Sequence, residues 1–103
     1  MREKFIEHKL VTETNKRGGL AWKFVSPGVV GVPDRIILLP QGKIGFVEVK
    51  APHKKPREIQ TRRIEQLREL GFKVFVLDGA EEIKNILEEI ENIDLPQSGG
   101  DAL

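Results

Sequence analysis

The sequence contains a glutamate and a lysine separated by one residue, Glu48 and Lys50, which could carry out chemistry together. They lie at the end of an apolar segment, residues 43–50, that predicts a β-strand. Because side chains alternate along a strand, both should point to one face, with Val47 and Val49 on the other. A carboxylate beside an ammonium group could bind a cation and position a water molecule. The same pair could also be an ordinary solvated pair on an exposed face.

A second carboxylate, Asp34, comes directly before the neighbouring predicted strand, 35–39. The turn Pro40-Gln41-Gly42 joins the two strands and predicts an antiparallel hairpin. If Gln41 is at the centre of the turn, Asp34 lies opposite Glu48, with the Cβ atoms roughly 5 Å apart. A two-residue turn would shift this register by one. Two adjacent carboxylates repel unless a proton or a cation lies between them, and a divalent metal is the simplest solution.

Two more polar side chains are predicted on helix faces that pack inward. Glu7 shares a face with Leu10 on the first predicted helix, and Gln60 lies in line with Ile64 on the second. A lone carboxylate on such a face costs free energy unless it has a partner. Each could be a boundary position with water nearby, but both occur in the same small domain as Asp34. We therefore expect Glu7, Asp34 and Glu48 to converge on one cation, with Lys50 beside it.

The elements that must position these residues follow from hydrophobic periodicity and from glycine and proline. The sequence predicts helix, three strands, helix, strand and helix, at 2–17, 20–25, 35–39, 43–50, 57–70, 72–77 and 80–92. The helix after the third strand allows a crossover to a parallel fourth strand, which indicates an α/β fold with a mixed sheet flanked by helices. We expect one domain over 1–93, with Trp22 in its core and the strand 72–77 buried, and a flexible tail over 94–103.

Composition excludes several kinds of site. The chain has 103 residues and no cysteine, so it is one domain without disulfides, thiolate catalysis or cysteine-bound zinc. Its two histidines, His8 and His53, are too few for a histidine-built metal cage. Oxygen ligands instead favour a hard cation, Mg²⁺ or Mn²⁺, as the cofactor. No signal peptide and no apolar run of roughly 18 residues is visible, so we expect a cytoplasmic protein without a membrane span.

Charge is distributed unevenly along the chain. Residues 1–77 carry 16 basic and 8 acidic side chains, whereas 78–103 carry 1 basic and 8 acidic ones. The basic part suits a polyanion such as DNA, although a solvated surface would have a similar composition. Glycine allows a backbone to approach a phosphate closely, or simply to turn, in the loop that precedes Asp34. The candidate DNA-binding residues are Ser26, Gly28, Gly31, Lys54, Lys55, Arg57, Arg62 and Arg63.

Taken together, these motifs resemble those of a known nuclease family. The segments Gly31-Val32-Pro33-Asp34 and Glu48-Val49-Lys50 resemble the PD-(D/E)xK signature. With Glu7 and Gln60 on the flanking helices, the chain is most similar to the virus-type replication-repair nucleases, the VRR-NUC family. The resemblance implies a restriction-endonuclease-like αβββαβ core with an added C-terminal helix. It also implies metal-dependent cleavage of DNA, by homodimers that act on branched substrates such as Holliday junctions.

The same resemblance assigns roles to individual residues. It implies that Asp34, Glu48 and the Val49 carbonyl bind the metal and that Glu7 completes the acidic site. Lys50 would serve the attacking water, and Gln60 would orient Lys50 or the phosphate. Two other readings remain open: an inactive nuclease scaffold that only binds DNA, and an interaction domain whose acidic last helix binds a partner protein.

Overall fold

The computed structural model describes residues 2–94 and contains the predicted elements in the predicted order. Two short 3₁₀ turns, Pro40–Gly42 and Ala80–Glu82, precede β3 and α3. The predicted tail from residue 95 onward lies outside the described residues. The elements are α1 (Glu3–Lys16), β1 (Leu20–Lys23), β2 (Arg35–Leu39), β3 (Lys43–Val49), α2 (Glu58–Glu69), β4 (Lys73–Leu77) and α3 (Ile83–Glu91).

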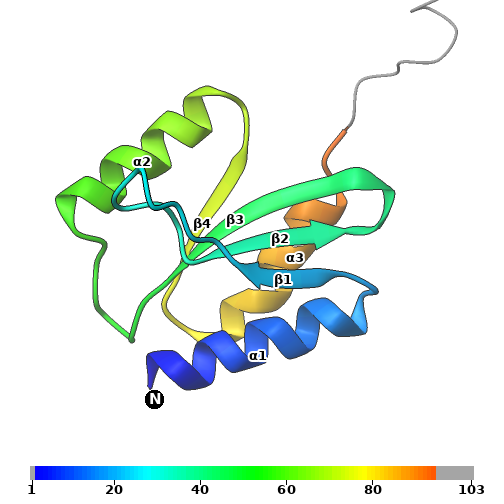
Figure 1. Cartoon of the computed structure of the whole chain (residues 1–103). Helices are drawn as coiled ribbons and strands as arrows, with labels where there is room; N and C mark the ends of the chain where they lie inside the picture. Colours follow the sequence, from blue (N-terminus) through cyan, green and yellow to red (C-terminus); the bar gives the residue numbers. More distant parts are fainter. Residues whose placement is uncertain (1, 95–103) are drawn as a thin grey trace, which may run out of the picture.

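The four strands form one mixed sheet in the order β1-β2-β3-β4. The first three strands pair antiparallel, and β4 joins β3 in parallel after the α2 crossover. Helices α1 and α3 cover one face of the sheet and α2 covers the other (Figure 1). The predicted α/β fold class is therefore confirmed.

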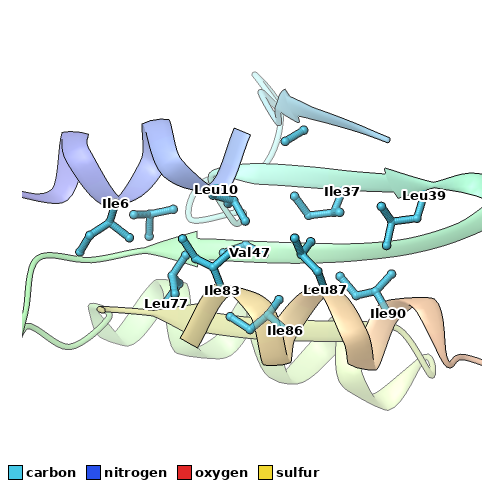
Figure 2. Close-up of a cluster of buried hydrophobic side chains, with 12 residues drawn as sticks. Ile6, Leu10, Ile37, Leu39, Val47, Leu77, Ile83, Ile86, Leu87 and Ile90 are labelled. Atoms are coloured by element: carbon cyan, nitrogen blue, oxygen red, sulfur yellow. The ribbon is translucent and has the colours of Figure 1, made fainter. Parts of the chain in front are cut away.

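The larger core lies between the sheet and the pair α1 and α3 (Figure 2). Val47 and Val49 of β3 point into it and are fully buried, as the alternation of strand side chains predicts. Along α3, apolar residues recur at helical spacing and all face this core. The buried helical residues of this core are Ile6, Leu10, Ile83, Ile86, Leu87 and Ile90.

A smaller core lies on the opposite face, under α2. Phe46 of β3, Val74 of β4 and Ile64 of α2 are buried together there. The ring of Phe24 packs against Phe46 with centroids 5.6 Å apart. Because neighbouring residues of β3 point to opposite faces, Glu48 belongs to this side of the sheet, with α2 above it.

The turn between β2 and β3 sets the register on which the site depends. Gln41, at its centre, has a φ of 72°, and Gly42 follows with a φ of 76°. The resulting ladder pairs Leu39 with Lys43 and Arg35 with Val47. One step further along the same ladder, Asp34 lies opposite Glu48, so the register predicted for a turn centred on Gln41 is confirmed.

Of two sequence expectations about burial, one is wrong and one is met in part, for the same reason. Trp22 is 57% exposed instead of lying in the core. The strand predicted over 72–77 is buried or half-buried from Val74 to Leu77, but Phe72 and Lys73 at its start are exposed. β1 and β4 are the two edge strands of the sheet, so their side chains are covered less completely than those of β2 and β3. Within residues 2–94, none of the helices is both long and apolar enough for a membrane span.

Candidate active site

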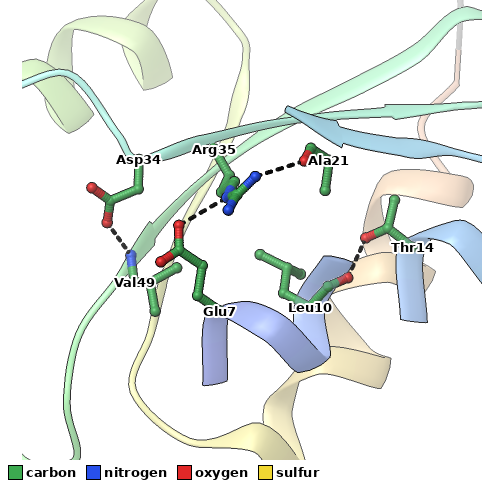
Figure 3. A network of polar contacts seen from close by, with 7 residues as sticks. All are labelled: Glu7, Leu10, Thr14, Ala21, Asp34, Arg35 and Val49. Atoms are coloured by element: carbon green, nitrogen blue, oxygen red, sulfur yellow. Dashed lines mark hydrogen bonds and ion pairs between the residues drawn. The ribbon is translucent and has the colours of Figure 1, made fainter. Parts of the chain in front are cut away.

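Asp34 lies at the end of the loop between β1 and β2, where β2 begins. Its Oδ2 accepts a hydrogen bond of 2.8 Å from the backbone N–H of Val49 (Figure 3). This bond directs the carboxylate across the hairpin to the end of β3. Asp34 and the end of the Glu48-Val49-Lys50 segment are therefore brought together, as the register requires.

Glu48 is the most deeply buried charged side chain among the described residues, with 1% of its surface exposed. Its Oε2 accepts a hydrogen bond of 2.8 Å from Gln60 Nε2 and lies 3.1 Å from Lys50 Nζ. Its Oε1 is buried and has no hydrogen-bond partner in the described part of the chain. An unsatisfied buried carboxylate oxygen is costly, so this atom is a natural ligand for a cation.

Burial raises the pKa of the Glu48 carboxyl above its ordinary value. The hydrogen bond and charge of Lys50 lower this pKa without cancelling the effect of burial, and the negative charges of Asp34 and of Glu3 on α1 raise it further. The positive charge of Lys50 therefore does not fully offset the cost of burying the ionised Glu48 carboxylate. A cation bound beside Asp34 and Glu48 would supply the missing positive charge.

Gln60 joins α2 to the site. Its Nε2 donates to Glu48, and its Oε1 accepts a hydrogen bond of 2.8 Å from the backbone N–H of Arg57 at the helix start. Both polar ends of the amide are therefore used, and the side chain is almost fully buried. The prediction that Gln60 faces inward together with Ile64 is confirmed.

Glu7 occupies a different position from the one expected. It is half-buried on α1, and its Oε2 accepts a hydrogen bond of 2.8 Å from Arg35 Nε, while Arg35 Nη1 donates to the carbonyl of Ala21 at 2.9 Å (Figure 3). Arg35 pairs with Val47 in the ladder and so points to the α1 side of the sheet, away from Glu48. Arg35 was not among the predicted site residues, although a single basic residue at the start of an apolar strand indicates that it needs a partner.

The expected convergence of three acids is therefore incomplete. Over residues 2–94, no group of three histidine or carboxylate side chains is arranged to hold one metal ion. The charges of Asp34 and Glu48 act on each other, whereas Glu7 forms an ion pair with Arg35. Asp34 and Glu48 nevertheless supply hard oxygen atoms of the kind that divalent cations prefer, and the unpartnered Glu48 oxygen supports that fit.

The structure also locates the candidate DNA-binding residues. Lys54, Lys55, Arg57 and Arg62 are exposed on the loop before α2 and on α2 itself. Arg63 is half-buried, and its Nε donates to the carbonyl of Val30 at 2.8 Å, so it holds the loop before Asp34. These positions leave the predicted role in DNA binding open for each of them.

The glycine-containing loop before Asp34 has a clear structural function. Gly31 has a φ of 89°, and a Cβ atom there would lie 3.0–3.2 Å from Ile59 atoms, so glycine lets the loop pack on the start of α2. Ser26 accepts a backbone hydrogen bond from Val29 in a turn, and Gly28 is exposed between them. No close approach to a phosphate is needed to explain Gly31.

Comparison with known proteins agrees with this geometry. The model of the VRR-NUC domain family matches residues 2–81. "Putative nuclease p44" of Acyrthosiphon pisum secondary endosymbiont phage 1 is 51% identical over 90 residues, which is 87% of this chain and 96% of that protein. A solved structure of a VRR-NUC domain superposes with a TM-score of 0.79 at 33% identity, covering 84% of this chain and 94% of the other. The chain is a nuclease domain and belongs to the VRR-NUC family.

Proposed function

We propose that this protein is a divalent-metal-dependent endodeoxyribonuclease that hydrolyses phosphodiester bonds in branched DNA. The observation that carries the proposal is the Asp34–Glu48 pair, with its buried and unpartnered Glu48 oxygen. If the two carboxylates had only a structural role, this buried Glu48 oxygen would remain unsatisfied, at a cost in stability. A cation site gives both carboxylates a partner and explains why Lys50 is held beside them.

Each residue of the candidate site has its own role in the proposed reaction. Asp34, Glu48 and the Val49 carbonyl would hold Mg²⁺ or Mn²⁺, and Lys50 Nζ, 3.1 Å from Glu48, would orient the attacking water and offset charge on the phosphate. When bound, the metal supplies Lewis acidity at the phosphoryl oxygen and lowers the pKa of its water. Gln60 holds Glu48 in place through its amide. Glu7, which pairs with Arg35 in the metal-free chain, would complete the acidic site from α1.

The proposal also specifies the substrate, branched DNA, and the oligomeric state, a homodimer. A four-way junction has approximate two-fold symmetry, and paired cuts need two active sites related by the same operator. One domain of 103 residues supplies one site. A homodimer would supply the second, which agrees with the small size of the chain.

The test is cleavage of a labelled four-way junction and of a linear duplex by the purified chain in Mg²⁺, Mn²⁺ or EDTA. Wild-type protein should cut the junction in either metal, and Asp34→Asn and Lys50→Ala should each reduce the rate by roughly a hundredfold or more. Glu65→Gln and Lys84→Ala are matched controls, because both residues are exposed away from the site. Both controls should retain wild-type rates.

Each alternative has its own result in this assay. Tight junction binding with no cleavage in any metal would identify an inactive nuclease scaffold. No binding at all would favour a partner-binding domain. Equal cleavage of junction and linear duplex would keep the nuclease and remove the preference for branched DNA.

A further inference from the structure

The loop between β1 and β2 presents apolar side chains to solvent directly before Asp34. Val29 is 42% exposed, and Leu70 at the end of α2 is 74% exposed. This loop lies against α2 in Figure 1. A contiguous patch of exposed apolar side chains often marks a binding surface, whereas single scattered ones do not.

The loop is held in place by its backbone. Phe24 N–H donates to the Asp34 carbonyl at 2.8 Å and closes the neck of the loop, and Arg63 Nε donates to the Val30 carbonyl at 2.8 Å. Gly31 packs against the backbone of Ile59 at the start of α2. Because these contacts involve the backbone, they fix the loop while leaving the valine side chains free for a ligand.

A groove of 520 Å³ runs between this loop and α2. Such a volume is typical of a small-molecule site. Phe24, which packs on Phe46 below, contributes an aromatic ring. The polar lining comes from Ser26, Glu69 and the pair Arg63 and Gln66, in which Arg63 Nη1 donates to Gln66 Oε1 at 3.0 Å. The apolar part of the lining comes from Phe24, Val29, Val32, Leu67 and Leu70.

The groove and the candidate active site share the same two elements. Asp34 follows the loop in sequence, and Gln60 precedes Arg63 by one turn of α2, a rise of about 4.5 Å along the helix. A nucleic-acid strand that follows α2 from the groove towards Gln60 would therefore lead to Asp34 and Glu48. The basic stretch 50–63, with six basic residues and one acidic residue, leads up to Arg63 and favours a polyanionic ligand over a neutral one.

We infer that this groove binds an unpaired nucleobase of the DNA substrate, at the point where strands separate. A base has two apolar faces and a polar edge with donors and acceptors, which match the apolar walls and the polar side chains of Arg63, Gln66 and Glu69. A fully stacked duplex offers no free base face. The groove thus gives the proposed nuclease a physical means of preferring branched or bulged DNA, and the inference depends on the proposed function only in taking DNA as the ligand.

The test compares binding of two duplexes of one sequence, with and without a single unpaired nucleotide, in EDTA so that no cleavage occurs. Wild-type protein should bind the bulged duplex roughly tenfold more tightly. Val29→Ser combined with Leu70→Ser should abolish that preference and leave affinity for the paired duplex unchanged. Val25→Ser is the matched control, since Val25 is exposed on the same loop but does not line the groove.

Equal affinity of the wild type for the two duplexes would overturn the inference, as would a double variant that keeps the preference. Leu70→Ser alone, at the exposed end of α2, should give an intermediate loss. If the double variant instead changes from dimer to monomer by sedimentation and weakens both affinities alike, the patch is a contact between copies. If the protein cuts junctions but does not prefer the bulged duplex, only this inference is wrong. If it prefers the bulged duplex but cuts no DNA, only the proposed function is wrong.

Discussion

The most informative single residue is Glu48. Its carboxylate is buried, next to a second carboxylate, and only one of its oxygens has partners. A buried carboxylate usually lies near enough positive charge to remain ionised without penalty. Here Lys50 supplies part of that charge, and the pKa of Glu48 is still raised by burial. The residue is thus held in a geometry that a bound cation would stabilise.

Replacing this carboxylate should therefore make the metal-free protein more stable. Glu48→Gln resembles the protonated side chain and keeps an acceptor for Gln60. The stability contributed by protonated Glu48 is complete at low pH and is lost as the pH rises through its raised pKa. In EDTA, the melting temperature of the variant should equal that of the wild type near pH 4 and exceed it by about a few degrees at pH 8.

Glu65→Gln, on the exposed face of α2, is the control and should match the wild type at both pH values. Adding Mg²⁺ at pH 8 should raise the melting temperature of the wild type and leave that of Glu48→Gln unchanged. A variant that melts below the wild type at pH 8 in EDTA would contradict this account of Glu48.

At the scale of elements, α2 and β3 are joined through one amide. Gln60 accepts from the Arg57 N–H at the start of the helix and donates to Glu48 at the end of the strand. The helix start therefore fixes the carboxylate, and the carboxylate fixes the first turn of the helix. The basic loop that precedes α2 is thereby tied to the site as well.

The variant Gln60→Glu should keep the hydrogen bond that Gln60 accepts from Arg57 and remove the one that it donates to Glu48. The new carboxylate can still accept from Arg57, but it faces Glu48 without a donor, so the two like charges repel. Urea denaturation in EDTA should show a loss of about 1–3 kcal/mol at pH 8, and a smaller loss near pH 5, where one proton can be shared. Gln66→Glu, on the exposed part of the same helix, should cost far less. A loss that does not depend on pH would contradict the proposed repulsion.

The hairpin shows what a sequence can determine at this scale. The predicted strands, the turn centred on Gln41 and the Asp34–Glu48 register depend on local chemistry, namely strand alternation and a residue with positive φ, and all are confirmed. The burial of Gln60 also followed from helical spacing alone. These features require knowledge of only one element, or of two joined by a short turn.

The errors concern features that depend on distant elements. Glu7 was correctly placed on the inward side of α1, but that side packs against the Val47 and Val49 face of β3, opposite Glu48. Which face a helix covers is decided by the whole chain path, so spacing within α1 could not reveal it. Trp22 was assigned to the core because an apolar strand does not show whether it is an edge.

At the scale of the whole molecule, the acidic helix α3 and the basic loop before α2 lie on opposite sides of the sheet. Helix α3 lies on the face opposite α2, and Arg17 pairs with Glu91 of α3 at 2.8 Å. Lys54 and Lys55 are exposed on the loop before α2, and other exposed basic residues lie on α2 and along α1. DNA is expected to approach from the α2 side, with α3 turned away from its phosphates.

The salt dependence of DNA binding would test this orientation. Each phosphate contact made by a lysine contributes roughly 0.9 to the slope of log affinity against log salt. Changing Lys54 and Lys55 together to glutamine should therefore reduce that slope by about 2, by the same amount for duplexes of different sequence. Fluorescence anisotropy in EDTA measures it across a salt series. Lys84→Gln on α3 is the matched control and should leave the slope unchanged, whereas a larger effect of Lys84→Gln would place the DNA on the α3 face instead.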